Sequence, residues 1–246
     1  MKNYALIGRR LSHSYSQRHF EELFLRLGLT DHSYTLHEME SLDSLRRWVA
    51  DEQINGFNVT VPFKQTIIPL LDELSPEAKA IGAVNCVVVN DGRLIGHNTD
   101  TPAFRQSIQN SAFKIQHSFI LGTGGAARAV AYALGQLGIP YAFVSRTPEN
   151  HENAIGYSQL STLNFQLPTL IVNATPVGMY PNTDRTPFSL PTTHCPLPTL
   201  FLYDLTYNPS PTLLMRQAAA LGAKTKDGLE MLRLQADLSW QIWQQN

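Results

Sequence analysis

The amino-acid sequence predicts an α/β protein of two domains, and three observations support this prediction. Short apolar and β-branched runs alternate with helical patterns along most of the chain, as they do in α/β folds. A Gly-rich turn near residue 122 joins a strand-like run to a helical run. The chain has 246 residues, of which 43% are hydrophobic, so its length suits one large or two small domains and its composition can fill a core.

The first half of the chain is predicted to form one α/β domain that ends near Asp100. Its strands are expected at residues 4–8, 34–37, 56–61, 83–89 and 93–96. Its helices are expected near residues 17–27, 42–50 and 76–81. Pro69 is expected to interrupt any helix that begins near Phe63, because proline lacks the backbone N–H. Asp100 precedes Thr101 and Pro102 and is expected to cap the N-terminus of a helix.

The second half is predicted to form another α/β domain. Its strands are expected at residues 119–121, 141–144, 170–173 and 201–205. Helices are expected after the first two of these strands, near residues 212–221, and over residues 229–244. The proline-rich segment 181–198 is expected to be a surface loop.

A polar constellation follows the strand-like run at residues 56–61. Thr60 brings a hydroxyl and Lys64 an ammonium to the point where the strand ends, with the amide of Asn58 beside them. Open α/β sheets bind ligands at the carboxyl ends of their strands. The segment therefore indicates a ligand site, and the alternative is an ordinary strand-to-helix junction with a solvated lysine.

The Gly-rich turn has the G-x-G-x-x-[GA] pattern of a dinucleotide-binding loop. Gly122 permits the tight turn, Gly124 lets the backbone approach a pyrophosphate, and Ala127 allows close packing of the helix. The N–H groups at the helix N-terminus favour phosphate. The second domain is therefore predicted to be of the Rossmann type. The residues expected to contact the cofactor here are Gly122, Thr123, Gly124, Gly125 and Ala126.

The end of the next strand indicates which dinucleotide binds. An NAD site usually has Asp or Glu about 20 residues after the first glycine, and this chain has Ser145, Arg146 and Thr147 there. A guanidinium and two hydroxyls suit a 2′-phosphate. These residues predict NADP as the cofactor, and the alternative is a solvated arginine at a strand end.

Eight motifs in order resemble the shikimate dehydrogenase family, from about residue 5 to residue 240. They occupy residues 12–16, 58–64, 83–85, 96–100, 122–127, 173–179, 203–209 and 227–236. The resemblance implies reversible reduction of 3-dehydroshikimate to shikimate with NADPH. It also implies a cytoplasmic enzyme of chorismate and aromatic amino acid biosynthesis, acting as a monomer or homodimer on a small-molecule substrate.

The resemblance also implies residue roles. Lys64 and Asp100 correspond to the catalytic pair, and Ser14 and Ser16 to the pair that holds the substrate carboxylate. Further substrate contacts are implied for Thr60, Asn85, Tyr207 and Gln235. Further cofactor contacts are implied for Thr175, Gly228 and Met231, the last two beside the nicotinamide.

Several of these residues also have ordinary structural interpretations. Ser14 or Ser16 could instead cap the helix that follows. Tyr207 could belong to a plain turn, and Gln235 to a solvated helix face. Asn85 is expected to interrupt a strand, where a buried amide needs partners, which favours a ligand role.

The chain departs from the family pattern at several positions. Arg9 and Arg10 replace part of Gly-x-Pro, Gln17 replaces a proline, and Thr101 replaces a glycine. Asn150 stands where a second basic residue often follows the cofactor loop, which weakens the argument for a 2′-phosphate. None of these departures alters Lys64, Asp100 or Gln235.

The resemblance implies domain boundaries and leaves two alternatives for the function. Residues 1–100 with 228–246 are expected to form the substrate-binding domain, and residues 101–227 the NADP-binding domain, with the active site in the cleft between them. One alternative is a quinate/shikimate dehydrogenase that uses NAD or both cofactors. The other is a non-catalytic NADP-binding protein with the same fold.

Composition excludes several other classes of protein. The net charge of −1 argues against nucleic acid or an anionic membrane as a partner. No apolar run approaches the length of a membrane span. Cys86 and Cys195 are isolated, which suits a reducing cytoplasm. The eight histidines lack metal-binding spacings, so no metal is expected.

Overall fold

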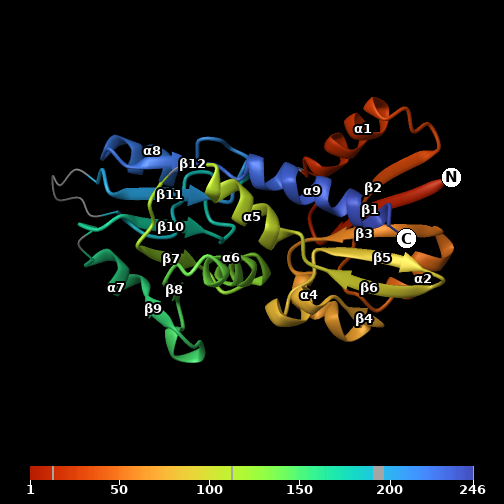
Figure 1. The fold of residues 1–246 in the computed structure, drawn as a ribbon, viewed down its shortest axis with the longest axis horizontal. Coiled ribbons are helices and arrows are strands. Elements are labelled where there is room, and N and C mark those ends of the chain that lie inside the picture. The colour runs from red at the N-terminus through yellow and green to blue at the C-terminus, as the bar shows by residue number, and fades with distance from the viewer. Residues whose placement is uncertain (13, 112, 164, 191–196, 246) are drawn as a thin grey trace. The chain divides into compact units, whose positions relative to one another are not determined.

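The computed structural model describes residues 1–12, 14–111, 113–163, 165–190 and 197–245. The chain divides into two compact units (Figure 1): unit 1 contains Met1–Ala103 and Leu232–Asn246, and unit 2 contains Phe104–Met231. Residues 191–196 of the predicted proline-rich loop, Cys195 among them, lie outside the described residues. The described parts of that loop contain no helix or strand.

Unit 1 is built on a six-stranded sheet with the order β2-β1-β3-β5-β6-β4. Its strands are β1 (Lys2–Gly8), β2 (His32–Glu38), β3 (Ile54–Val59), β4 (Glu73–Leu74), β5 (Cys86–Asn90) and β6 (Arg93–His97). β1 pairs in parallel with β2 and β3, whereas β5 is antiparallel to β3 and β6. The carboxyl ends of β1 and β3 and the amino end of β5 therefore lie at one edge of the sheet.

Helices cover both faces of this sheet, because its central strands are apolar on both sides. Ala5 and Ile7 of β1 pack in one cluster with side chains of α2, α3 and α4. Tyr4 and Leu6, which alternate with them, pack in a second cluster with α1 and α9. The helices are α1 (Ser16–Arg26), α2 (Leu45–Asp51), α3 (Phe63–Thr66), α4 (Pro76–Ile81) and α9 (Leu229–Trp243), and a 3₁₀ turn, η1, covers Ile68–Leu70.

Unit 2 has a six-stranded parallel sheet with the order β12-β11-β10-β7-β8-β9. Its strands are β7 (His117–Leu121), β8 (Tyr141–Ser145), β9 (Ala154–Gly156), β10 (Thr169–Asn173), β11 (Leu200–Asp204) and β12 (Lys224–Lys226). Its other elements are α5 (Asp100–Gln109), α6 (Gly125–Gln136), η2 (Pro148–Asn150), α7 (Tyr157–Ser161) and α8 (Leu213–Ala220). Counted along the unit, the order is 3-2-1-4-5-6 reversed, which is the doubly wound order of Rossmann folds.

The unit boundary falls within two helices. α5 runs from Asp100 in unit 1 into unit 2, and α9 runs from Leu229 in unit 2 into unit 1. The final segment of the chain thus packs with the N-terminal sheet: Ala236 and Trp243 lie in the same cluster as Tyr4.

The predicted strands and long helices are present, with several corrections to their ends. β3 ends at Val59 rather than residue 61, and Val61 is 65% exposed. β5 begins at Cys86, so Asn85 precedes the strand instead of interrupting it. Asp100 is the first residue of α5 rather than a cap before it. The interruption at Pro69 is confirmed, because α3 ends at Thr66 and a 3₁₀ turn follows.

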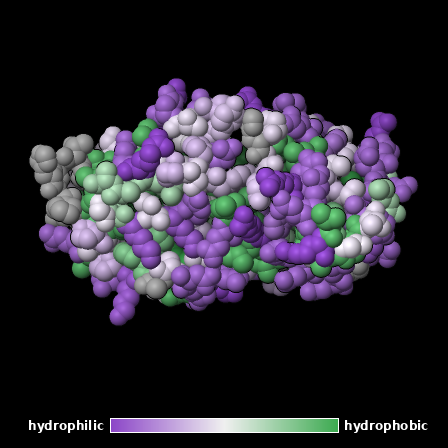
Figure 2. Space-filling model, turned by 90° about the horizontal axis from the view of Figure 1, so that it is seen from above, coloured by the Kyte–Doolittle hydropathy of each residue, from purple (hydrophilic) through white to green (hydrophobic). Residues whose placement is uncertain are grey.

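Hydrophilic residues predominate on the face of the molecule in Figure 2, where hydrophobic residues are exposed in small groups. Over the part of the chain that the structure describes, no helix combines the length and apolar character needed to cross a membrane. The longest, α9, carries polar and charged residues along its length.

Candidate active site

A largely buried ion pair lies at the edge of the unit 1 sheet where β1 and β3 end. Lys64, on α3, places its Nζ 2.6 Å from Oδ2 of Asp100, the first residue of α5. The two side chains are 16% and 6% exposed. An ammonium and a carboxylate held this closely form a charge-assisted hydrogen bond. Such a pair can give a proton to a bound substrate and take one back.

Asn85 joins this pair to the loop before β5. Its Nδ2 donates to Asp100 Oδ1 at 3.0 Å and to Thr99 Oγ1 at 2.8 Å, and its Oδ1 accepts from the Thr99 N–H at 2.7 Å. The N–H of Val84 donates to the backbone carbonyl of Lys64 at 2.7 Å. Side-chain and backbone bonds thus fix Lys64, Asn85 and Asp100 in one arrangement.

Gln235 of α9 completes this group. Its side chain is only 9% exposed, so the alternative of a solvated helix face is wrong. Its Oε1 lies 3.3 Å from Asn85 Nδ2, and its Nε2 donates to the Leu232 carbonyl at 2.9 Å. Lys64, Asn85, Asp100 and Gln235, which are up to 171 residues apart in sequence, therefore meet at one place in unit 1.

Ser14, Ser16 and Thr60 lie on the segments that follow β1 and β3. Ser14 Oγ accepts the N–H of Ser16 at 3.2 Å, and Ser16 is the first residue of α1. The N-cap residue is Tyr15, which makes no side-chain capping bond, so neither serine is the cap residue. A Cβ on Gly8 would lie 2.6 Å from Thr60 Cγ2, so only glycine lets the end of β1 approach Thr60 this closely.

The glycine turn of unit 2 has the geometry of a phosphate-binding loop. Gly122 follows β7 with φ +97°, and Gly124 is the N-cap of α6. A Cβ on Gly124 would have no atom within 4 Å, so the space in front of it is open. Ala127 is completely buried against the sheet. Thr175 lies beside the turn, since a Cβ on Gly122 would be 3.1 Å from its Cγ2.

The segment after β8 presents the groups predicted for a 2′-phosphate. Arg146 and Thr147 are exposed, and Ser145 is buried. Ser145 Oγ accepts the N–H of Thr147 at 3.1 Å, which fixes the turn. An exposed guanidinium next to two hydroxyls suits a phosphate monoester. These residues, with the glycine turn, fit the dinucleotide that the sequence predicts.

Tyr207, Gly228 and Met231 also belong to unit 2. Tyr207 is partly exposed on the segment after β11, and Met231 is buried. No side chain fits at Gly228, because a Cβ there would overlap the carbonyl of Leu205. Gly228 is therefore required for the close approach of these two backbone segments.

Asp204 supports this region, although its role was missed in the sequence. It is completely buried at the end of β11, where burial raises the pKa of its carboxyl and hydrogen bonds oppose that rise. It accepts from Asn173 Nδ2 at 3.0 Å, from the Thr206 N–H at 3.0 Å and from Thr212 Oγ1 at 2.8 Å. Asp204 therefore links the ends of β10 and β11 to the start of α8.

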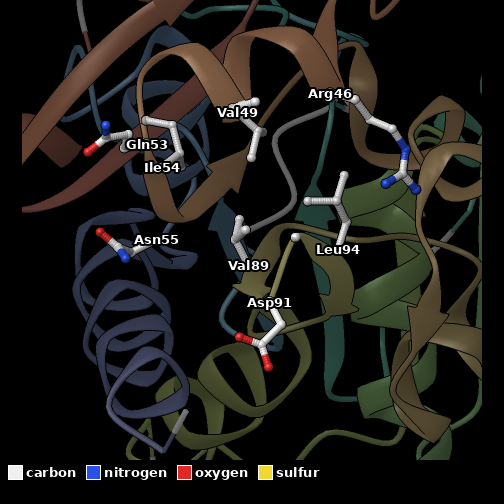
Figure 3. Close-up of a pocket in the computed structure, with 10 residues that line it drawn as sticks. Arg46, Val49, Gln53, Ile54, Asn55, Val89, Asp91 and Leu94 are labelled. Atoms are coloured by element: carbon white, nitrogen blue, oxygen red, sulfur yellow. The ribbon is translucent and has the colours of Figure 1, made fainter.

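A hollow of about 350 Å³ in unit 1 lies elsewhere (Figure 3). It lies at the amino end of β3, where Ile54 lines it, whereas Lys64 follows the carboxyl end. Arg46 on its rim is paired with Asp72 at 2.8 Å. The hollow contains none of the predicted site residues. Across the described residues, no cluster of three or more His, Cys, Asp and Glu side chains could hold a metal ion.

The chain is similar to known proteins over nearly its whole length. A family model described as the shikimate dehydrogenase substrate binding domain matches residues 6–87. A shikimate dehydrogenase (NADP(+)) of Caldicellulosiruptor saccharolyticus is 33% identical over 260 residues, which cover 99% of this chain and 92% of the relative.

Two crystal structures extend the similarity to the whole fold. Shikimate dehydrogenase 1 from Peptoclostridium difficile is 35% identical with a TM-score of 0.87, covering 100% of this chain and 92% of that one. Shikimate 5-dehydrogenase from Thermus thermophilus, in complex with NADP(H) and shikimate, is 31% identical with a TM-score of 0.85, covering 100% and 94%.

Proposed function

The chain belongs to the shikimate dehydrogenase family, and we propose on this basis that it catalyses the reversible reduction of 3-dehydroshikimate to shikimate with NADPH. The observation that carries the proposal is the buried Lys64–Asp100 pair, with 2.6 Å between Nζ and Oδ2. It lies in the unit that contains the match to the substrate-binding domain.

Lys64 acts as the proton donor in this reaction. NADPH supplies a hydride to the carbonyl carbon of the substrate, and negative charge then develops on the carbonyl oxygen. The Lys64 ammonium transfers a proton to that oxygen, and the product is an alcohol. In the oxidative direction, neutral Lys64 accepts the hydroxyl proton as the hydride leaves the same carbon. Asp100 holds Lys64 in place and balances its charge.

The neighbouring polar groups orient the substrate ring. Asn85, Asp100 and Thr60 bind its hydroxyl groups, and Gln235 and Tyr207 make further contacts. Ser14 and Ser16 donate hydrogen bonds to the carboxylate through their hydroxyl groups. The proximity of Asn85, Asp100 and Gln235 supports this assignment, since Asn85 Nδ2 lies 3.0 Å and 3.3 Å from the other two.

Unit 2 binds the cofactor. The glycine turn from Gly122 to Ala126 and the N-terminus of α6 hold the pyrophosphate, and Thr175 lies beside the turn. Arg146, with Ser145 and Thr147, binds the 2′-phosphate. Gly228 and Met231 lie beside the nicotinamide. We propose residues 1–100 with 228–246 as the substrate domain and residues 101–227 as the NADP domain, boundaries that differ by three or four residues from those of units 1 and 2.

We further propose that the protein acts in the cytoplasm, as a monomer or homodimer, in the biosynthesis of chorismate. Its ligands are the small-molecule substrate and NADP, with no nucleic acid, membrane or metal. The net charge of −1 supports the absence of a polyanionic partner.

Initial rates with shikimate and quinate, each with NADP and NAD, test the proposal. We expect the highest kcat/KM for shikimate with NADP. Comparable or higher kcat/KM for quinate with NAD would instead identify a quinate/shikimate dehydrogenase, an alternative favoured by Asn150 at the place of a second basic residue. Absence of turnover in all four combinations, with NADP still bound, would identify a non-catalytic NADP-binding protein.

A further inference from the structure

Asn58 is buried, and the protein itself satisfies its side-chain amide. Its side chain is 4% exposed although it lies in the motif that carries Lys64. Its Nδ2 donates to the Asn85 carbonyl at 3.1 Å and to Ser239 Oγ at 2.8 Å, and its Oδ1 accepts from Tyr34 OH at 2.8 Å. Both amide hydrogens are therefore used within the protein.

Ser239 is the partner of Asn58 on α9 and is completely buried. Its Oγ donates to the carbonyl of Gln235, one turn earlier, at 2.9 Å, and lies 3.3 Å from Thr99 Oγ1. Thr99 Oγ1 in turn accepts from Asn85 Nδ2. One hydroxyl thus connects β3, the segment before α5 and the turn of α9 that carries Gln235.

We propose that Ser239 and Asn58 are positioning residues, which hold α9 so that Gln235 faces Asn85 and the Lys64–Asp100 pair. Residues four apart lie on the same helix face, so anchoring Ser239 also sets the direction of Gln235. Trp243, one turn further, donates its Nε1 to the Val87 carbonyl at 3.0 Å and fixes the end of the helix. The bonds of Ser239 are closer to Gln235, and they reach Asn58 and Thr99, both of which bond to Asn85.

Removal of the Ser239 hydroxyl should disturb both Asn58 and Gln235. An Nδ2 hydrogen of Asn58 loses its acceptor at a buried position, and a buried unpaired polar group is costly. The turn of α9 at Gln235 then shifts or loosens. Because Gln235 is proposed to contact the substrate, this inference rests on the proposed function.

Ser239→Ala tests the inference through steady-state kinetics. We expect KM for shikimate to rise about tenfold while KM for NADP stays unchanged. A change of this size matches the free energy of one buried hydrogen bond. Ser107→Ala is the matched control in unit 2. Ser107 is also a completely buried helical serine, whose Oγ donates to the Phe104 carbonyl at 2.8 Å and lies 2.8 Å from Tyr203 OH. It should lower Tm without changing KM for shikimate.

A double-mutant cycle with Gln235→Ala shows whether Ser239 acts through Gln235. In that background, Ser239→Ala should change KM for shikimate by less than about twofold, because the group it positions is gone. An equal rise in KM with and without Gln235 would overturn the inference. So would a lower Tm of Ser239→Ala with KM for shikimate unchanged.

Tyr34→Phe provides the same test if Ser239→Ala does not fold. It removes the donor to Asn58 Oδ1 and leaves Ser239 intact. The Tyr34 hydroxyl also interacts with Ser16, so only the part of the effect on KM that depends on Gln235 bears on the inference. A rise in KM for shikimate that disappears in the Gln235→Ala background supports the inference, and an unchanged KM overturns it. A parent enzyme that does not oxidise shikimate overturns the proposed function and this inference together. An active parent with unaffected variants overturns this inference alone.

Discussion

The candidate substrate site of unit 1 and the candidate cofactor site of unit 2 differ in how far the protein itself satisfies their polar groups. In unit 1, Lys64, Asn85 and Asp100 bond to one another at 2.6–3.0 Å and are largely buried. In unit 2, the space before Gly124 is open and Arg146 is exposed.

If both proposals hold, the substrate site is preorganised, whereas the cofactor site is completed by its ligand. The geometry of the Lys64–Asp100 pair is fixed before substrate binds, which favours proton transfer without rearrangement. The proposed cofactor site offers backbone N–H groups and one exposed charge, which the phosphates of the cofactor would pair. Substitutions in unit 1 should therefore affect both catalysis and stability, and substitutions at the cofactor site should affect cofactor binding alone.

The largest effect is expected for Lys64→Ala. It should lower kcat for shikimate oxidation about 100-fold or more, because a positioned acid/base is lost. It should also lower Tm, since Asp100 remains buried without its cation. Steady-state kinetics and thermal unfolding measure both. Lys79→Ala, an exposed lysine on α4, is the matched control. A kcat within a few-fold of the parent value would rule out the catalytic role.

Arg146→Ala should act on the cofactor only. Loss of a charge-assisted bond to the 2′-phosphate should cost about 1.5–3 kcal/mol, which raises KM for NADP about 10- to 100-fold. KM for NAD and Tm should change little. Arg216→Ala, an exposed arginine on α8, is the control. Equal rises in KM for NADP and NAD would show that Arg146 does not act on the 2′-phosphate. The cofactor site would then no longer contrast with the substrate site in the way described above.

Ser16→Ala should act on substrate binding. It removes one hydrogen bond to the carboxylate, so KM for shikimate should rise about tenfold while affinity for NADP is spared. Kinetics and Tm should be measured on the same variant. A fall in Tm with KM for shikimate unchanged would exclude the carboxylate role and leave Ser16 as a structural residue of α1.

The smallest effect is expected for substitution of Asp204. Unlike the exposed groups of the cofactor site, Asp204 is a buried group of unit 2 whose hydrogen bonds are all made within the protein. Burial raises the pKa of its carboxyl above the ordinary 3.8, so the folded state holds the proton more tightly than the unfolded state. The contribution of Asp204 to stability is therefore most favourable below the unfolded pKa and declines as pH rises through the folded pKa.

Asp204→Asn removes this titration. The free energy of unfolding of the variant, minus that of the parent, should therefore increase as pH rises from about 4 towards neutrality. Thermal or denaturant unfolding across this pH range measures the difference. A difference that is the same at every pH would contradict a raised pKa.

Local patterns in the sequence predicted most of the fold. The Gly122 turn was recognisable because one short segment contains the strand, the turn and the helix start. The three-residue strands β9 and β12 were not predicted, because pairing at a sheet edge rather than an apolar pattern stabilises them. Helix α5 was predicted only as a cap at Asp100, although its apolar residues Ala103, Phe104 and Ile108 follow helical spacing.

Local sequence patterns predicted less of the candidate site than of the fold. Lys64 stood out as a polar residue at a strand end, whereas the roles of Asp100, the serines and Gln235 came from the resemblance to a family. Ser239 carries no local signal, since a serine in an amphipathic helix is common. Its role depends on Asn58, which is 181 residues away in sequence, and only the three-dimensional structure brings them together.

The central claim, that this chain is an NADPH-dependent reductase of 3-dehydroshikimate with Lys64 as proton donor, is tested most directly by NADPH consumption. Purified protein should oxidise one NADPH for each 3-dehydroshikimate added at limiting substrate, and Lys64→Ala should be at least about 100-fold slower. NADPH that stays unconsumed in the presence of folded parent protein and 3-dehydroshikimate would contradict the claim.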